Sequence, residues 1–342
     1  MQSRFKQAAL FSVKLLLSIA VLVYIVRGLD LQQLRSHLVS VDPLLFVLAL
    51  TLIFFQTFVL NGRWALIMRA LGVSLDWFAG WRILMISLWF NQVLPSSVGG
   101  DAVRMWLLRQ RGVQWPDAVK GVAADRFTAL IGLIVLMVAG LPFLMSRVSN
   151  QAAILAIGGL TLAGIAGTAV LLTLDRLPMR LIAHPAIASF VRFGTLVRFL
   201  LLQSERRVLL FGSALLIHLV TAAACYALAH GVGAQLSMVD AGILIPPVVL
   251  LTAVPISISG WGVREGAMVA CLGLAGVPSE QALSVSLLLG AISVIIGLVG
   301  GAIWLASPER GLYSADRAAK ATKATDEFPN YGPAAEEVSS HP

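Results

Sequence analysis

Two arginines, Arg104 and Arg264, each follow a glycine-containing break at the point where an apolar run resumes. A helix that restarts there presents free backbone N–H groups and the positive end of its dipole, and both favour an anion. If the runs lie in a membrane, each charged side chain costs about 2.5–3.5 kcal/mol to insert, so its default interpretation is functional. The two arginines together predict a phosphate-binding site.

Acidic neighbours of these arginines leave several roles open. Asp101 and Glu265 would counter a cationic headgroup, carry a proton during transport, or only neutralise the arginines. In the alternative interpretation the charges are structural struts, with Arg104 paired to Asp101 and Arg264 paired to a carboxylate of the other half of the chain. The sequence does not separate these roles.

Other polar and aromatic residues lie near the breaks. Asp125 and Arg126 are adjacent on a predicted helix, so they need separate partners, and we expect one of them to reach the first break. Asn91 would contact either a ligand or freed backbone groups. Trp261 would pack an acyl chain, cap the cavity or simply fill space. Four serines have the same alternatives as Asn91. They are Ser96, Ser97, Ser257 and Ser259.

Both breaks belong to a repeated decapeptide. Pro-Ser-Ser-Val-Gly-Gly-Asp-Ala-Val-Arg at 95–104 recurs as Pro-Ile-Ser-Ile-Ser-Gly-Trp-Gly-Val-Arg at 255–264. Such an interruption of an apolar run is typical of a discontinuous membrane helix whose unwound turn lines a site. The predicted hinge residues are Pro95, Gly99, Gly100, Pro255, Gly260 and Gly262. The alternative is that two short Pro/Gly-rich segments resemble each other by chance or for packing.

The composition predicts an integral membrane protein. Of the 342 residues, 58% are hydrophobic and 12% charged, and the mean hydropathy is +0.88. Runs of about 20 apolar residues, enough to cross a bilayer, occur at 8–26, 43–61, 126–145, 152–174, 208–230 and 282–305. Shorter runs at 83–95 and 241–258 lead into the decapeptides. We predict an all-α polytopic fold with about six full transmembrane helices and two re-entrant, broken-helix hairpins.

The lysines and arginines predict which way the chain crosses the membrane. With a cytoplasmic N-terminus, most of the 25 fall in cytoplasmic segments, Arg63 among them, as the positive-inside rule requires. Both termini are then cytoplasmic, and the hairpins enter from opposite faces as an inverted repeat with halves at roughly 43–145 and 208–305. We expect a membrane domain over 1–306 and a disordered tail over 307–342. Tryptophans of the first half, including Trp64, are expected in an interfacial belt.

Several function classes lack their sequence signals. The net charge of +8 fits cytoplasmic loops and contact with anionic lipid better than nucleic acid. The histidines and the two cysteines have no metal-binding spacing, and there is no Walker loop, GxSxG motif or dinucleotide fingerprint. We therefore predict no cofactor, no metal and no catalytic site. Any transport would be downhill, ion-coupled or driven by the membrane potential.

In these motifs the chain resembles the lysylphosphatidylglycerol synthase transmembrane-region family. These flippase-like proteins form the membrane half of bacterial multiple peptide resistance factors. The resemblance covers about 1–306 and rests on Arg63-Trp64, Asn91, Leu94-Pro95, Gly99 through Arg104, Asp125-Arg126 and Pro255 through Gly266. It implies a bacterial or archaeal cytoplasmic membrane and movement of a polar lipid between leaflets. The two-part relatives carry an aminoacyl-transferase domain that this sequence lacks, so we expect no lysyl-phosphatidylglycerol synthesis.

These observations predict a lipid translocase, with Arg104 and Arg264 holding the headgroup phosphate near mid-membrane. The expected partner is an anionic or aminoacylated polar lipid, or a polyprenyl-phosphate-linked one, supplied by a separate lipid-modifying enzyme. One alternative is a membrane-embedded enzyme that uses Asp101, Asp125 or Glu265 as acid or base. A non-transporting envelope assembly factor is the other alternative, and in that case the arginines would be dispensable.

Overall fold

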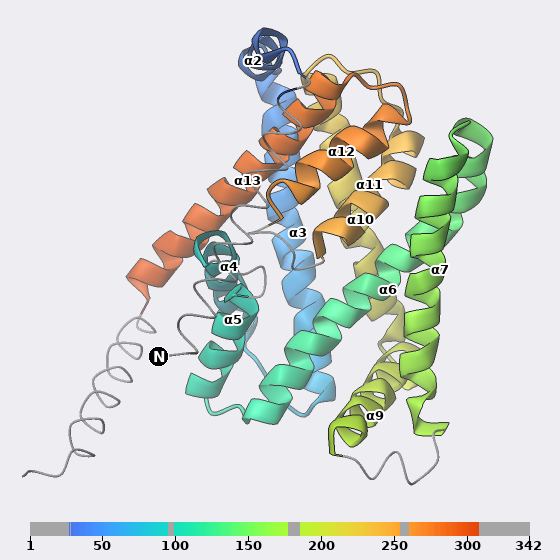
Figure 1. Ribbon diagram of the computed structural model, residues 1–342. Coiled ribbons are helices and arrows are strands. Elements are labelled where there is room, and N and C mark those ends of the chain that lie inside the picture. The colour runs from blue at the N-terminus through green and yellow to red at the C-terminus, as the bar shows by residue number, and fades with distance from the viewer. Residues whose placement is uncertain (1–26, 28, 95–98, 177–184, 254–259, 308–342) are drawn as a thin grey trace, which may run out of the picture. The chain divides into compact units, whose positions relative to one another are not determined.

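The computed structural model describes residues 27, 29–94, 99–176, 185–253 and 260–307, and nearly all of them lie in helices (Figure 1). No strand occurs in these ranges, which confirms the predicted all-α fold. The described residues up to Ile303 form one compact unit.

Within the described ranges, five helices are long and apolar enough to cross a membrane. They are α3 (Pro43–Ala70), α6 (Trp115–Arg147), α7 (Gln151–Thr173), α10 (Arg207–Gly231) and α13 (Ser279–Ala306). Each coincides to within a residue with one of the predicted apolar runs or contains it, so helices are confirmed at these five runs. The run predicted at 8–26 and the tail from 308 onward lie outside the described residues.

The two predicted hairpins correspond to two pairs of shorter helices. The first pair is α4 (Trp77–Val93) with α5 (Gly99–Gln110), and the second is α11 (Met238–Ala253) with α12 (Val263–Gly273). The segments between the members of each pair, 95–98 and 254–259, are not among the described residues. Six residues named above therefore cannot be placed. They are Pro95, Ser96, Ser97, Pro255, Ser257 and Ser259.

The same order of elements occurs twice along the chain. A long helix, a tight turn, a shorter helix, a break, a second shorter helix, another tight turn and a long helix follow each other over 43–147 and again over 207–306. Each tight turn contains a glycine with positive φ, at Gly72, Gly112, Gly233 and Gly276. Its N–H and the next residue's N–H donate to carbonyls of the helix that ends there. An inverted relation between these halves stays a prediction.

Four smaller elements complete the described chain. Helix α2 (Leu31–Val39) begins behind Asp30, whose carboxylate accepts hydrogen bonds from two backbone N–H groups of the first turn. A short 3₁₀ turn (Leu174–Arg176) follows α7. Helix α9 (Pro185–Arg198) continues into a π-helical turn (Phe199–Gln203).

Close approach explains the glycine pair at the start of α5. Gly99 and Gly100 both lie inside the first helical turn, without positive φ. A Cβ on Gly100 would overlap the backbone carbonyl oxygen of Ser87 and lie 2.6 Å from the side chain of Asn91. The N–H of Gly100 also donates to Oδ1 of Asn91 at 2.9 Å. These contacts hold α5 directly against α4.

Gly260 and Gly262 at the second break differ from that pair. Their φ angles are 80° and 85°, a region that side-chain-bearing residues rarely adopt. At Gly260 and Gly262, glycine is therefore required because of the backbone conformation. At Gly100 it is required because a side chain has no space. A hinge motion at either break stays a prediction.

Replacing Gly100 by alanine should loosen α5 from α4, because the new methyl group meets backbone rather than a movable side chain. We expect a loss of about 1–3 kcal/mol in stability, read as a lower unfolding temperature in detergent. Gly159→Ala is the matched control, since a Cβ at that exposed helical position meets nothing within 4 Å. Equal unfolding temperatures for the two variants would contradict the close approach.

Candidate functional site

Two arginines share one carboxylate where α3, α5 and α6 meet. Nε of Arg63 donates to Oδ1 of Asp125 at 2.8 Å, and Nη1 of Arg104 donates to Oδ2 at 3.0 Å. The side chains of Arg63, Arg104 and Asp125 are 2%, 3% and 5% exposed. Removing an ion from water costs several kcal/mol, and only close, well-oriented partners offset that cost. We call these three residues, together with Trp64, the α3–α5–α6 cluster.

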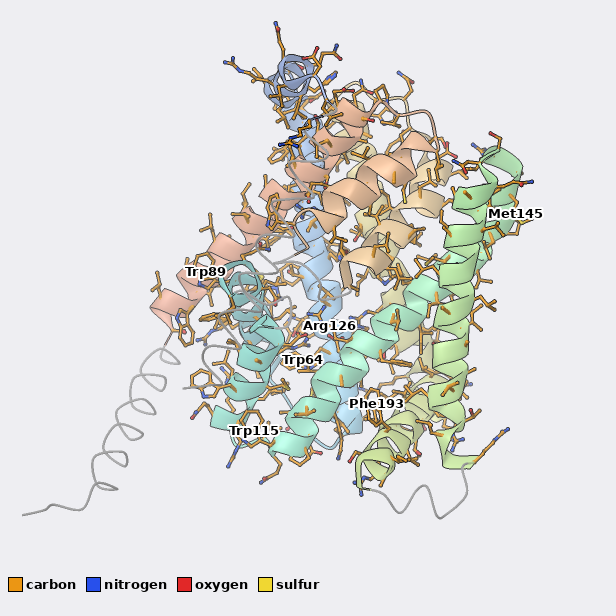
Figure 2. All side chains as sticks on the ribbon, viewed as in Figure 1. Trp64, Trp89, Trp115, Arg126, Met145 and Phe193 are labelled. Carbon is orange, nitrogen blue, oxygen red and sulfur yellow. The ribbon has the colours of Figure 1, made fainter. Side chains whose placement is uncertain are left out.

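Trp64 forms one wall of this cluster. Cζ of Arg104 lies 3.7 Å from the centroid of its ring, a cation–π distance, and Trp64 itself is fully buried. The prediction of Trp64 as an interfacial belt residue is therefore wrong. Figure 2 labels Trp64 near the crossing of α3 and α6.

A second ion pair links α5 to α6 beside the cluster. Nε and Nη2 of Arg126 donate to the two carboxylate oxygens of Asp101 at 2.8 and 3.0 Å. The side chain of Asp101 is 9% exposed and that of Arg126 is 58% exposed, so this pair is more open than the α3–α5–α6 cluster. Figure 2 labels Arg126 close to Trp64. Asp125 and Arg126 thus have separate partners, as predicted, and both reach α5. The strut in which Arg104 pairs with Asp101 is not observed, because Arg104 pairs with Asp125.

The α3–α5–α6 cluster keeps unused hydrogen-bond donors. Four buried nitrogens find no hydrogen-bond partner within the described ranges. They are Nη1 of Arg63, Nε and Nη2 of Arg104, and Nε1 of Trp64. Leaving a buried donor unpaired costs about 1–3 kcal/mol, and more when the group is charged. One carboxylate also neutralises only one of the two guanidinium groups. The cluster therefore combines excess positive charge with free donors, which is the chemistry of an anion site.

The second arginine lies in a different environment, between α12 and α13. Nη2 of Arg264 donates to Oε1 of Glu265 at 2.8 Å, and its Nε lies 3.2 Å from Oγ of Ser286. Ser286 donates to the same Oε1 at 3.0 Å, while Oε2 of Glu265 accepts from the N–H of Gly262 at 2.5 Å. Cζ of Arg264 lies 4.6 Å from the ring centroid of Trp261. We call these residues the α12–α13 cluster; its charges are balanced.

The predicted site residues thus fall into two groups. Asp101, Arg104, Asp125 and Arg126 lie together on α5 and α6, with Asn91 holding the start of α5. Arg264 pairs with its own neighbour Glu265 rather than with a carboxylate of the other half. The hydrogen bonds of Arg104 and Arg264 described above stay within their own groups. A pocket shared by both arginines stays a prediction.

Sequence reasoning missed Arg63 as a site residue. The predicted apolar run ended at residue 61, and Arg63 was assigned to a cytoplasmic segment. Helix α3 instead continues to Ala70 and buries Arg63. An arginine and a tryptophan directly behind an apolar run were the available signal, since a helix can extend through a charge that finds a partner. No group of three or more His, Cys, Asp and Glu side chains gathers in the described part of the chain to hold a metal.

Comparison with protein families supports the resemblance drawn from the motifs. The family model described as the lysylphosphatidylglycerol synthase TM region matches residues 11–301, which is most of the chain. No curated protein matches closely enough to count as a relative. The matched range includes both clusters.

Asp125 should be the most sensitive carboxylate for folding, because its loss leaves two buried guanidinium groups without a counter-charge. We expect Asp125→Asn to destabilise the protein by about 3–5 kcal/mol, measured by thermal unfolding in detergent. The control is Asp117→Asn, whose partner Lys120 is half-exposed and whose effect should stay within about 0.5 kcal/mol. A similarly small effect of Asp125→Asn would show that the shared carboxylate does not hold the three helices together.

Proposed function

Because the chain belongs to the lysylphosphatidylglycerol synthase TM region family, a family of membrane proteins of lipid modification or translocation, we propose that it translocates a polar lipid with an anionic headgroup. The lipid would pass between the leaflets of the cytoplasmic membrane. The chain would lie in that membrane with both termini in the cytoplasm, as its distribution of positive charge favours.

The observation that carries this proposal is the unbalanced charge of the α3–α5–α6 cluster. Arg63 and Arg104 face a single carboxylate, and buried donors on both arginines and on Trp64 have no partner within the described ranges. A phosphate group supplies the missing negative charge together with several acceptor oxygens. Binding it would satisfy donors that otherwise make the fold less stable.

The same charge explains how a headgroup could cross the bilayer. A bare phosphate pays a large desolvation cost in hydrocarbon. A buried guanidinium pair with one spare positive charge replaces part of the lost hydration, and so lowers the barrier to crossing. Arg126, which is exposed and paired with Asp101, would then contact the headgroup as it arrives or leaves.

We assign the phosphate to the α3–α5–α6 cluster rather than to both arginines equally. Glu265 already neutralises Arg264 and also accepts from the backbone at the start of α12. Arg264 would therefore bind an anion only if Glu265 released it. In the proposal Arg264 and Glu265 form a second, weaker binding position for the headgroup during translocation. A separate enzyme would make the transported lipid.

Arg104→Gln should slow lipid exchange while leaving the protein folded, because the Arg63–Asp125 pair remains neutral and intact. The assay uses purified protein in phosphatidylcholine vesicles with fluorescent phosphatidylglycerol, and dithionite to bleach the outer leaflet. We expect exchange to fall about tenfold or more, which corresponds to ~1.4 kcal/mol of lost stabilisation. A parallel arm with a fluorescent polyprenyl phosphate distinguishes the two anionic lipid classes.

Arg147→Gln is the matched control, since Arg147 is half-exposed and pairs with Asp240 away from the cluster. It should exchange lipid like the wild type. Equal exchange by the wild type and Arg104→Gln would contradict the proposal. A lipid product of changed mass, found by mass spectrometry without any exchange, would favour a membrane-embedded enzyme instead.

A further inference from the structure

An open apolar groove runs along the bundle between α3 and α10. Its volume is about 400 Å³. Besides Arg63 and Arg69, its lining includes Phe58, Gly62, Leu66, Trp77, Leu209 and Ser213. Helices α3 and α10 pack against each other, and both are long and apolar enough to cross the membrane. In the proposal below, the groove opens toward lipid hydrocarbon rather than toward water.

Small and apolar residues form the surface of the groove. A Cβ on Gly62 would lie 3.3 Å from the ring of Trp77, so the tryptophan closes directly over the glycine. On α10, Ser213 turns its hydroxyl back to the carbonyl of Leu210 at 2.8 Å and presents no free polar group to the groove. Leu209 is 62% exposed. These surfaces suit an acyl chain.

Two arginines of α3 lie along this groove at different depths. Arg69 is exposed in the last turn of the helix, at the end where α10 begins. Arg63 lies about 9 Å deeper along the axis, given a rise of about 1.5 Å per residue. Arg63 also belongs to the α3–α5–α6 cluster, where its Nη1 has no partner within the described ranges. The groove thus places an exposed cation, Arg69, and an apolar surface beside Arg63, whose buried Nη1 has a free donor.

We propose that this α3–α10 groove is the lateral entry by which an anionic membrane lipid reaches the α3–α5–α6 cluster. One acyl chain lies along Phe58, Leu66 and Leu209, while the phosphate passes from Arg69 to Arg63. This inference rests on the proposed function and adds where the lipid enters and what selects it. The occupant is a lipid because the lining is mostly apolar. Its headgroup is anionic because the two charged residues that line the groove, Arg63 and Arg69, are both positive.

Photocrosslinking tests the groove directly. Purified protein is placed in nanodiscs that contain phosphatidylglycerol with a diazirine on one acyl chain, and labelled peptides are located by mass spectrometry. Labels should gather on 58–69 and 207–213. Ser213→Phe fills the groove and should reduce both this labelling and lipid exchange about tenfold, equivalent to ~1.4 kcal/mol. Gly212→Phe is the matched control, because a Cβ at this neighbouring exposed position meets nothing within 4 Å.

Arg69→Gln gives a second test that does not depend on how Ser213→Phe folds, since Arg69 is exposed. The wild type should label more strongly with the phosphatidylglycerol probe than with a phosphatidylcholine probe of the same chains, and this variant should lose part of the difference. Equal labelling by both probes in the wild type would overturn the selection of an anion. Equal labelling of Ser213→Phe and Gly212→Phe would overturn the groove.

The two proposals fail in distinguishable ways. If Arg104→Gln blocks exchange but Ser213→Phe exchanges and labels like the wild type, the lateral entry is wrong and translocation stands. If Ser213→Phe loses the labels that the wild type and Gly212→Phe keep, the groove binds lipid. If the wild type then exchanges no lipid, the proposed translocation is wrong.

Discussion

One carboxylate between two buried guanidinium groups is the interaction on which the rest of this structure depends. Asp125 accepts from Arg63 on α3 and from Arg104 on α5, and it lies itself on α6. The carboxylate of Asp125 thereby links three helices through two ion pairs. Because the carboxylate balances only one of the two cations, the same contact that joins the helices leaves positive charge inside the bundle. The structural role and the proposed binding role have one origin.

The backbone supports this interaction with two separate uses of glycine. Gly100 lets α5 lie against α4. This packing fixes the position of α5, from which Arg104 contacts Asp125 on α6. At the second break Gly262 has positive φ, and its N–H is held by Glu265. That carboxylate also neutralises Arg264. The two repeats therefore carry clusters of different charge. The α12–α13 cluster is neutral, whereas the α3–α5–α6 cluster has one excess positive charge.

The sequence was sufficient to predict the helices, but not which charged side chains pair between them. Hydropathy predicted five of the described spans, because hydrocarbon tolerates only helices whose backbone groups are satisfied internally. The breaks before Arg104 and Arg264 were also visible, since proline and glycine interrupt apolar runs. Arg63 was missed as a site residue because a hydropathy pattern ends at a charge even where the helix continues. The Arg104–Asp125 pair was missed because the alternative considered lay three residues away on the same helix, whereas the actual partner comes from α6.

The most direct test of the account is whether the buried excess charge binds an anion. Native mass spectrometry of the purified protein can compare phosphatidylglycerol with phosphatidylcholine of identical chains, for the wild type and for Arg104→Gln. We expect the wild type to prefer phosphatidylglycerol about tenfold, or ~1.4 kcal/mol, and the variant to lose this preference. The same preference in both proteins, or none in the wild type, would contradict the account.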